Sequence, residues 1–590
     1  MPASRWLIPT VDLQAAGRLA AALDISAPAA RVLVRRGFAD PDAARSFLQP
    51  SLDDLHDPYR MLGMQAAVDR LRLAIREHQK ILIYGDYDVD GTTSVVLLTK
   101  AIHIAGGSAE YKIPHRLNEG YGMRSEVVES AAAQGVKLIV SVDTGIRAAE
   151  VVTRGNELGI DTIVTDHHLP DAALPPAVAV LNPNQQQCPY PYKDLCGAAV
   201  AFKLAHALLS TLGWDAAKLR RTVESLLKMV AIATVADVVP LTGENRVIVK
   251  HGLDRLSEVR NPGLRALLDV AGFPNGAVPT SRQVAFQIAP RLNAAGRMDT
   301  AKTVIDLFLS TDPTRAHELA QQLQDQNLER RQVQMEIREI CEQIPVEDST
   351  AALVYYSEQW HRGVLGIVAS KLVERFHRPV FVLGRNAEDG MAQGSGRSIP
   401  AFHLLDALES MSDLFTRFGG HMHAAGVTLD CDRVEEFRRR FNAYAANCLR
   451  PEDFLPTWEI DAVLELREID ERAVDDLFAL APFGHGHEQP SFAVLNVEVA
   501  SAPLVMKEKH LRIPFRQNGR TLAFKAWNFA DRLPELAPGS RVDVVFRLEE
   551  DSYSAGRGFP PWAAIVRDIR PASTATSPDA AYRSAETAAP

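Results

Sequence analysis

Cysteine is scarce in this sequence, with five residues in a chain of 590. An odd number, scattered from Cys188 to Cys448, does not form the disulfide framework typical of small secreted domains. Cys188 and Cys196 lie close together, but no second pair of ligands follows at the spacing of a zinc finger. We therefore expect reduced thiols without a bound metal.

Long apolar runs are also absent. No segment approaches the roughly 18 apolar residues of a membrane span. The first residues, Met1 to Pro9, lack the apolar core of a signal peptide. The contents of hydrophobic residues (46%) and charged residues (23%) are ordinary for a globular protein. These features predict a cytoplasmic protein with no membrane segment.

A basic excess is absent as well, because the formal net charge is −10. This charge argues against an obligate nucleic-acid binder, which usually has a basic face. The average conceals an uneven distribution, however, since residues 501–571 contain 12 Lys and Arg against 8 Asp and Glu. A nucleic-acid partner therefore stays open, above all for the C-terminal part.

What the chain does have is a concentration of carboxylates directly after an apolar run. Residues 81–91 read Ile-Leu-Ile-Tyr-Gly-Asp-Tyr-Asp-Val-Asp-Gly, with Asp86, Asp88 and Asp90 at alternate positions. Neighbouring carboxylates raise one another's pKa, and a divalent cation such as Mg²⁺ or Mn²⁺ removes that repulsion by binding their oxygens. An EF-hand calcium loop is the alternative, but it requires Glu six residues after its glycine, where this chain has Leu97.

Two further apolar runs end in residues that bind metals. Residues 136–142 lead to Asp143, and residues 161–165 lead to Asp166, His167 and His168. Because successive side chains at a strand end point to opposite faces, one imidazole can bind a metal while the other faces a phosphate or a second metal. An isolated histidine pair would indicate a structural role, but three strand ends of this type together favour one metal centre.

Asp237 is a further ligand candidate, since it interrupts the apolar helical run of residues 229–240. A buried carboxylate needs a partner, and a metal ion is a suitable one. The alternative is an ordinary polar residue at the C-terminal end of a helix.

Segments of β type and of helical type alternate between residues 78 and 240. This alternation predicts an α/β domain with a parallel sheet and helices on its faces. Ligands of such sheets bind at the carboxyl ends of the strands, which is where the carboxylates and histidines fall. The expected strands are residues 80–84, 137–142, 162–165 and 178–181, and the expected helices are residues 92–105 and 147–158.

The chain is too long for one hydrophobic core, and three or four domains are expected. Between Pro313 and Pro345 there is no Gly or Pro for 31 residues, which predicts a bridging helix of roughly 46 Å. The predicted divisions are a mostly helical N-terminal region (1–75), the parallel-sheet domain (76–312), the bridging helix (313–345), a smaller α/β domain (346–453), an oligonucleotide-binding β-barrel (454–571) and a disordered tail (572–590).

Short β-type segments after residue 454 predict the barrel. They are residues 492–499, 512–515, 521–527, 541–546 and 563–566. The basic excess of this part, together with Phe524 and Trp527 as expected exposed aromatics, fits a groove in which single-stranded bases stack.

Taken together, the motifs Tyr84–Gly91, Ser141–Gly145, Asp166–His168 and Ala233–Leu241 resemble the DHH phosphoesterases. Within that superfamily the chain is similar to the single-strand-specific DNA exonucleases, over nearly its whole length. Further motifs resemble the family's metal-domain and DHH-associated-domain sequences, namely Arg291–Arg297, His361–Ser370, Gly394–Ser398 and Gly419–Gly426. The resemblance identifies residues 76–312 as a DHH catalytic domain and residues 346–453 as a DHH-associated (DHHA1-like) domain.

The resemblance implies a set of site residues and a reaction, 5′-to-3′ degradation of single-stranded DNA to 5′-mononucleotides in repair and recombination. One or two Mn²⁺ or Mg²⁺ ions would activate a water and stabilise the leaving oxygen. The implied metal ligands are Asp86, Asp88, Asp90, Asp143, His167 and Asp237, with His168 and Asp166 as catalytic residues. The implied contacts to DNA and to its 5′-phosphate are Asn293, Arg297, His361, Ser395, Gly396, Arg397, Ser398, His421 and His423.

The implied partners are single-stranded DNA and repair proteins such as helicases and single-strand-binding protein, with a monomer as the expected state. Two positions depart from family patterns. Small DHH pyrophosphatases have His where this chain has Tyr84, which makes Asp86 the natural substitute ligand, and the barrel turn Pro482–Pro490 has His487 in place of the family's Asn.

Two other functions stay open. A phosphodiesterase of short oligoribonucleotides or cyclic dinucleotides could have the same catalytic half, although such proteins usually lack the terminal barrel. An inactive DNA-binding scaffold is disfavoured by the complete set of ligands. Arg297 could instead form a buried interdomain ion pair, and a glycine-rich loop such as Gly394–Ser398 is weak evidence for phosphate binding by itself.

Overall fold

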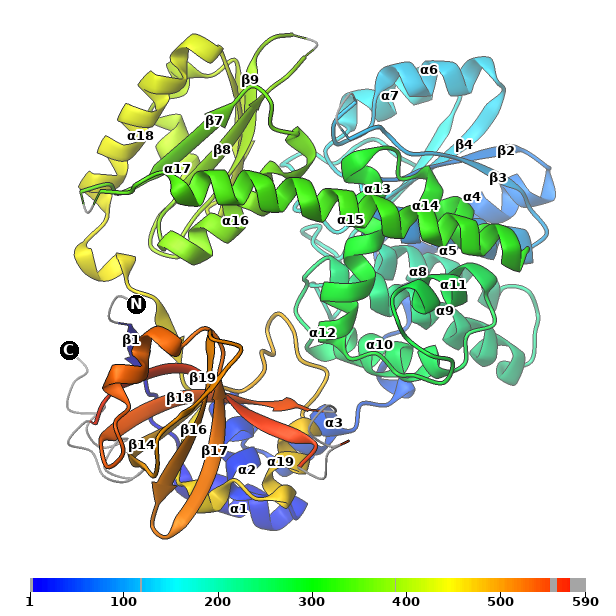
Figure 1. Ribbon diagram of the computed structural model, residues 1–590. Coiled ribbons are helices and arrows are strands. Elements are labelled where there is room, and N and C mark those ends of the chain that lie inside the picture. The colour runs from blue at the N-terminus through cyan, green and yellow to red at the C-terminus, as the bar shows by residue number, and fades with distance from the viewer. Residues whose placement is uncertain are drawn as a thin grey trace. The chain divides into compact units, whose positions relative to one another are not determined.

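The computed structural model describes residues 4–116, 119–347, 349–387, 389–551, 556 and 560–572. The chain forms two compact units, whose elements are labelled in Figure 1. Unit 1 combines Met1–Ser51 with Leu455–Phe483 and His487–Pro590, and unit 2 consists of Leu52–Phe454 with Gly484–Gly486. The predicted N-terminal region, residues 1–75, is thus divided between the two units. From residue 573 onward the predicted disordered tail lies outside the described residues.

A five-stranded parallel sheet forms the centre of the first part of unit 2. Its strands are β3 (Ala109–Lys112), β2 (Lys80–Tyr84), β4 (Val136–Val142), β5 (Asp161–Thr165) and β6 (Ala179–Leu181), in that order. All pairings are parallel, as predicted. The sequence pattern does not predict β3, because this edge strand reads Ala-Glu-Tyr-Lys and has no apolar run.

Helices cover both faces of this sheet (Figure 1). Alternate residues of β2 face the two sides of the sheet. Ile81 and Ile83 pack with α5 (Val89–Ile104) and α8 (Gly197–Ser210), whereas Leu82 and Tyr84 pack with α6 (Ser125–Ala133) and α7 (Ala149–Glu157). The helices of this part are α4 (Met64–Arg76), α5 (Val89–Ile104), α6 (Ser125–Ala133), α7 (Ala149–Glu157), α8 (Gly197–Ser210), α9 (Ala216–Ala236), α10 (Gly243–Asp254), α11 (Pro262–Val270), α12 (Ser281–Gln283), α13 (Ala289–Met298) and α14 (Lys302–Leu309).

The predicted long helix is α15 (Pro313–Gln343), with 31 residues. It begins where the carboxylate of Asp312 accepts hydrogen bonds from the backbone of Thr314 and Arg315, with Pro313 as its first residue. After it comes a second sheet, in the order β10 (Arg417–Gly420), β11 (Ala424–Leu429), β9 (Ala392–Arg397), β8 (Val380–Arg385), β7 (Leu353–Ser357). Its helices are α16 (Leu365–Phe376), α17 (Leu404–Glu409) and α18 (Val434–Cys448).

Gly394–Arg397 forms part of strand β9 and is not the loop that the sequence predicts. A Cβ atom at Gly396 would lie 2.4 Å from the ring of Phe381. The glycine therefore permits sheet packing, and its close approach is to this ring.

Unit 1 contains a seven-stranded sheet that closes on itself. Neighbouring strands pair in the order β14–β18–β19–β17–β16, and an additional pairing of β14 with β16 completes the ring. The strands are β12 (Thr457–Glu459), β13 (Ala462–Leu464), β14 (Phe492–Val499), β15 (Leu504–Met506), β16 (His510–Gln517), β17 (Arg520–Ala526), β18 (Arg541–Glu550) and β19 (Trp562–Pro571), of which β12 pairs outside this sheet with β1 (Arg5–Leu7). The predicted barrel is confirmed.

The prediction that Phe524 is exposed is wrong. Phe524 alternates inward on β17 and is fully buried against Phe515 and Phe546, because the barrel interior must be filled by side chains. Trp527 follows the end of the strand and is 43% exposed.

The N-terminal helices belong to the barrel's core. The helices are α1 (Leu13–Leu23), α2 (Ala27–Arg35) and α3 (Pro41–Leu48), and α19 (Glu471–Phe478) joins them. Leu19, Leu33 and Phe47 share one hydrophobic cluster with Leu464 and Phe492. This packing explains why the first residues of the chain form a unit with its last third.

His487, at the unusual turn, is buried in the same unit. One of its ring nitrogens lies 2.9 Å from the Arg36 guanidinium and the other lies 3.0 Å from the carbonyl oxygen of Leu480. Its ring also stacks on Phe483. Across the described ranges, no helix is both long and apolar enough to cross a membrane.

Candidate metal centre

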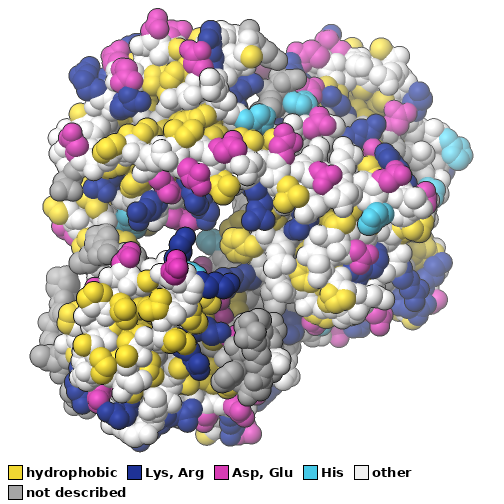
Figure 2. Space-filling model, viewed as in Figure 1, with side chains coloured by type: hydrophobic (Ala, Val, Ile, Leu, Met, Phe, Trp, Pro, Cys, Tyr) yellow, Lys and Arg dark blue, Asp and Glu magenta, His cyan; other side chains and the backbone are white. Residues whose placement is uncertain are grey.

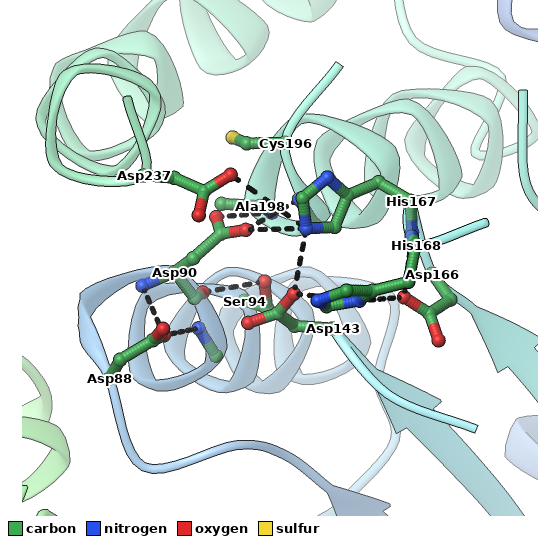
Figure 3. Close-up of polar contacts among 12 residues, drawn as sticks. Asp88, Asp90, Ser94, Asp143, Asp166, His167, His168, Cys196, Ala198 and Asp237 are labelled. Carbon is green, nitrogen blue, oxygen red and sulfur yellow. Dashed lines mark hydrogen bonds and ion pairs between the residues drawn. The ribbon is translucent and has the colours of Figure 1, made fainter. Parts of the chain in front are cut away.

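The carboxyl ends of β2, β4 and β5 bring the predicted ligands together. Asp86, Asp88 and Asp90 follow β2, Asp143 follows β4, and His167 follows β5. Three sets of side chains have ligand atoms within 4.8 Å of one another, namely Asp90, His167 and Asp237; Asp86, Asp88 and Asp143; and Asp143, His167 and His168. Figure 3 shows Asp90, Asp143, His167 and Asp237 pointing toward a common centre.

Asp88 and Asp90 have different local roles in the turn that starts α5. The Asp88 carboxylate caps the helix by accepting hydrogen bonds from the backbone of Asp90 (2.9 Å) and Gly91 (3.0 Å). Asp90 lies in the first turn and is only 1% exposed. The capping arrangement therefore fixes the direction in which Asp90 enters the site.

The N-terminus of α8 holds the Asp90 carboxylate. The backbone N–H groups of Gly197 and Ala198 donate to its two oxygens at 2.6 and 2.8 Å. A helix N-terminus favours a carboxylate at this place. Residue 197 must also be glycine, because a Cβ atom there would lie 2.7 Å from the Asp143 carboxylate. The sequence pattern gives no sign of these backbone donors.

His167 stands at the centre of the acidic side chains. Its Nε2 atom lies 3.2 Å from Asp143 Oδ1, 3.7 Å from Asp237 Oδ2 and 3.8 Å from Asp90 Oδ2. Burial lowers the pKa of His167 despite these carboxylates. The neutral imidazole is the form that binds a metal.

Several carboxylate oxygens of the centre are buried without a hydrogen-bond donor among the described residues. They belong to Asp86 (Oδ1), Asp143 (Oδ1) and Asp237 (Oδ2). Burial, followed by the neighbouring carboxylates, raises the pKa of Asp86 and of Asp143 well above the ordinary value and that of Asp237 to about 9. Orphaned acidic oxygens around a neutral imidazole fit a divalent cation.

The backbone is strained at two of these positions. Asp143 has φ 58° and Val238, which follows Asp237, has φ 60°. A β-branched residue rarely adopts this left-handed conformation, and such strain concentrates at functional sites. Val238 is also 65% exposed.

Asp166 and His168 form a separate pair at the edge of the centre. Asp166 is fully buried and accepts hydrogen bonds from His168 Nδ1 (2.7 Å) and from the backbone of Ile146. Burial alone would lower the pKa of His168, but the bond to Asp166 outweighs it and the pKa is raised. Asp166 therefore orients the ring of His168.

Tyr121 is a neighbour of His168 that the sequence pattern does not single out. Its hydroxyl lies 3.2 Å from His168 Nδ1 and donates to the carbonyl oxygen of Asp143 at 3.3 Å. The side chain is 51% exposed. Its place in Gly120-Tyr121-Gly122, soon after β3, is the only signal that could have indicated it.

Three arginines gather beside the carboxylates. Burial lowers the pKa of Arg297 to about 9 and that of Arg397 in the same direction, and in both cases the next cause is the charge of Arg116. Arg116 also lies over the ring of Tyr87, 4.7 Å from its centroid. None of the three forms an ion pair with a carboxylate in the part of the chain that the structure describes. The sequence does not indicate Arg116, because a single arginine after a strand belongs to no recognisable motif.

The other predicted substrate residues are placed less uniformly. Ser395 accepts a hydrogen bond from Arg397 at 2.7 Å and thereby orients it, whereas the Ser398 hydroxyl donates to the carbonyl oxygen of Phe402. Asn293 accepts from the backbone of Val89 (3.3 Å), in the metal-binding turn. His361 caps the short helix before α16, and His421 and His423 are exposed between β10 and β11.

Comparison with known proteins matches three parts of the chain to family models. A family model of the DHH family, N-terminal domain, matches residues 80–234. A model of the DHHA1 domain matches residues 349–447, and one of the RecJ OB domain matches residues 460–558.

Curated relatives named single-stranded-DNA-specific exonuclease RecJ extend over most of the chain. That of Escherichia coli (strain K12) is 39% identical over 522 residues, which are 85% of this chain and 90% of the relative. That of Bacillus subtilis (strain 168) is 38% identical over 555 residues, 93% of this chain and 69% of the relative. The chain belongs to the RecJ family.

The solved structures agree with membership of the RecJ family. The crystal structure of RecJ in complex with Mn²⁺ from Thermus thermophilus matches with a TM-score of 0.82 and 29% identity, over 97% of this chain and 80% of that one. The Mg²⁺ complex from the same organism matches with a TM-score of 0.76. The predicted resemblance and the predicted fold are both confirmed.

Proposed function

We propose that this chain is a metal-dependent exonuclease that degrades single-stranded DNA from its 5′ end to 5′-mononucleotides, in DNA repair and recombination. The observation that carries the proposal is the convergence of orphaned carboxylate oxygens and one neutral imidazole from three strand ends and from the C-terminal end of α9. Membership of the RecJ family supports the same reaction.

The residues divide naturally between two cations, Mn²⁺ or Mg²⁺. Asp90, His167 and Asp237 would hold one, Asp86 and Asp88 the other, and Asp143, which belongs to groups on both sides, would lie between them. Such a pair supplies charge stabilisation at a phosphoryl group and lowers the pKa of a water. Asp86 thus takes the ligand role that the change to Tyr84 leaves vacant.

His168 is proposed to act on the leaving group. Because its Nδ1 atom is bound to Asp166, Nε2 is the nitrogen that can face the substrate. The raised pKa of His168 favours a protonated ring. A protonated Nε2 can hold the scissile phosphate and give its proton to the departing 3′-oxygen.

The three arginines are proposed to bind the terminal 5′-phosphate. Arg116, Arg297 and Arg397 are half-buried, have like charge and have no carboxylate partner among the described residues. A dianionic phosphate removes their repulsion, and guanidinium groups bind phosphate through paired hydrogen bonds. Binding of the terminal phosphate beside the metal centre sets the 5′-to-3′ direction.

The barrel is proposed to bind the remaining single strand. Its basic excess and the exposed Trp527 support this role. From the family resemblance we also propose a cytoplasmic monomer that works with helicases and single-strand-binding protein.

The test is digestion of 5′-labelled and 3′-labelled single strands with Mn²⁺, beside a duplex and a cyclic dinucleotide. We expect labelled mononucleotides at once from the 5′-labelled strand. The duplex and the cyclic dinucleotide should react slowly or not at all, and no substrate should react in EDTA. Asp90→Ala, Asp143→Ala and His167→Ala should each abolish turnover while the far-ultraviolet circular dichroism stays unchanged. Preferred hydrolysis of the cyclic dinucleotide, or full activity in EDTA, would overturn the proposal.

A further inference from the structure

Phe286 is the most exposed large hydrophobic side chain of the described residues, at 73%. It belongs to the π-helix Val284–Ile288, which joins α12 to α13. Val284 and Ile288 are fully buried on either side of it, so the segment is anchored while Phe286 extends into solvent. Single π-helical turns are rare and occur frequently at functional sites.

The helix that follows runs past the metal-binding turn. Asn293 of α13 accepts a hydrogen bond from the backbone of Val89, and Gly296 lies against the carbonyl oxygen of Tyr87. The next residue, Arg297, belongs to the arginine cluster at the terminal-phosphate position. From Arg297 toward its N-terminus, α13 therefore runs past the metal-binding turn to the π-helical segment that contains Phe286.

Phe286 lies two to three helical turns before these groups. It precedes Asn293 by seven residues and Arg297 by eleven, along the π-helical turn and then α13. Eleven residues correspond to roughly 16 Å along the axis. This distance exceeds the single nucleotide that would separate the 5′-phosphate from the scissile bond.

Unpaired cations accompany this stretch of α13. The helix packs against α15, where Arg291 donates to Gln324 Oε1 at 2.7 Å, and Arg297 is close enough to feel the charge of Arg330. The charge of Arg331 likewise acts on Arg291 and Arg330. None of Arg291, Arg330 and Arg331 has an ion-pair partner within the described ranges. Figure 2 shows Lys and Arg side chains lying among hydrophobic ones on the face of unit 2 that carries α15.

We propose that Phe286 stacks on a base of the single strand on the 3′ side of the scissile phosphate, while Arg291 and Arg331 neutralise the adjoining backbone phosphates. An aromatic platform flanked by unpaired cations is the combination by which proteins bind single strands without sequence preference. The inference rests on the proposed function, because it takes its substrate and its strand direction from there. It gives unit 2 a binding surface of its own, independent of the barrel.

The experiment compares wild type, Phe286→Ala and Phe286→Trp on 5′-phosphorylated oligonucleotides of two and twelve nucleotides. The control is Ile104→Ala, an exposed hydrophobic residue (40%) at the other end of α5, away from the metal-binding turn. We expect Phe286→Ala to lower kcat/KM on the 12-mer about tenfold more than on the dinucleotide, in the range that loss of a base–aromatic stack produces. Phe286→Trp should restore the 12-mer, and Ile104→Ala should resemble wild type on both.

A scan with one abasic site at successive positions of the 12-mer locates the contact. In wild type, one position on the 3′ side of the scissile bond should weaken binding, and this effect should vanish in Phe286→Ala. Equal losses on both lengths, or an abasic effect that persists in Phe286→Ala, would overturn the inference. The scan is read by fluorescence anisotropy, which measures binding and not cleavage. If the protein cleaved no DNA but still bound it in a way that depends on Phe286, the inference would be supported and the proposed function refuted.

Discussion

At the scale of single residues, the buried carboxyls of the metal centre disfavour one another's ionised form, and a bound cation removes this repulsion. Burial and mutual repulsion raise the pKa of Asp143 and of Asp86 and bring that of Asp237 to about 9. Without a metal, the folded protein therefore holds a proton on Asp237 at neutral pH, where an ordinary aspartate holds none. A metal that binds Asp237 must displace this proton.

Metal binding should consequently release protons and strengthen as pH rises. Between the ordinary pKa of an aspartate and about 9, Asp237 holds a proton in the folded metal-free protein. This proton is lost when the metal binds, so a higher pH favours the metal-bound state. We expect Mn²⁺ affinity to increase from pH 6.5 to pH 8.5. Calorimetry in two buffers of different ionisation enthalpy measures the released protons, and Asp237→Asn should release fewer. Heats that do not depend on the buffer would contradict the prediction.

Recognition of the terminal phosphate is a second property of individual side chains. Arg397→Ala should weaken the reaction chiefly on 5′-phosphorylated strands, because a charge-assisted contact contributes roughly 1.5–3 kcal/mol. The comparison is kcat/KM on 5′-phosphate and 5′-hydroxyl oligonucleotides, with the exposed Arg417→Ala of the same sheet as control. An equal loss on both substrates would assign Arg397 to another task.

The residues that the sequence predicts well are those that follow apolar strands. Asp86 to Asp90, Asp143 and His167 converge because parallel strands end at one edge, a property that reads directly from the alternation of segments. Arg116, Tyr121 and the N–H groups of Gly197 and Ala198 are different. They reach the site from a loop and from a helix N-terminus, and only tertiary structure determines where these arrive.

At the scale of elements, α8 connects the metal centre to a buried charged network. Its first turn holds Asp90, and further along it Lys203 pairs with Glu244 at 2.5 Å and donates to the carbonyl oxygen of His56. Next to these, burial and then the charge of Lys203 lower the pKa of His206 to about 4. His206 is thus neutral in the folded state throughout the mildly acidic range.

Acid should therefore destabilise unit 2 through His206. Because its folded pKa lies below the ordinary 6.5, the unfolded chain binds a proton between pH 6.5 and about 4 that the folded chain does not. From pH 7 to pH 5 this group should remove about 2 kcal/mol from the free energy of unfolding. Denaturation of wild type, His206→Gln and the exposed control His103→Gln at both pH values checks it. The decline should be smaller in His206→Gln alone, and equal declines in all three would refute it.

Elements with a strong apolar run agree with their predictions, whereas those stabilised by neighbours do not. Strands β2 and β14, which have apolar runs, match their predictions closely. Helix α15 also matches, but its prediction comes from the absence of Gly and Pro. Short edge strands such as β3 and β15 lack a periodic signal. The glycines of β9 favour a loop on local propensity alone, but packing against Phe381 decides for a strand.

At the scale of the whole molecule, the first 51 residues and the barrel form one unit. Leu19, Leu33 and Phe47 are buried in the same cluster as Phe492, and β1 pairs in parallel with β12. Sequence order hides this arrangement, since more than 400 residues of unit 2 separate the partners. A protein that ends after Phe454 would keep these helices and lose the surface that covers them.

Two fragments should therefore behave differently, although both contain the whole metal centre. Residues 52–454 should stay monomeric and cleave short 5′-phosphorylated strands in Mn²⁺. Residues 1–454 should aggregate, because the apolar faces of α1, α2 and α3 would be exposed to water. Size-exclusion chromatography and dinucleotide hydrolysis measure both properties, and a monomeric 1–454 fragment would show that the N-terminal helices are stable without the barrel.

The same comparison measures what the barrel contributes to binding. The full chain should bind a long single strand more tightly than residues 52–454, and its affinity should fall more steeply with salt, since each neutralised phosphate of a single strand adds about 0.7 to the slope of log K against log salt. Residues 52–454 should retain a shallower dependence, from the arginines of α13 and α15. The measurement is a salt titration of anisotropy with one long oligonucleotide. Identical affinity and slope for both proteins would remove the barrel from DNA binding and leave it as a surface for partner proteins.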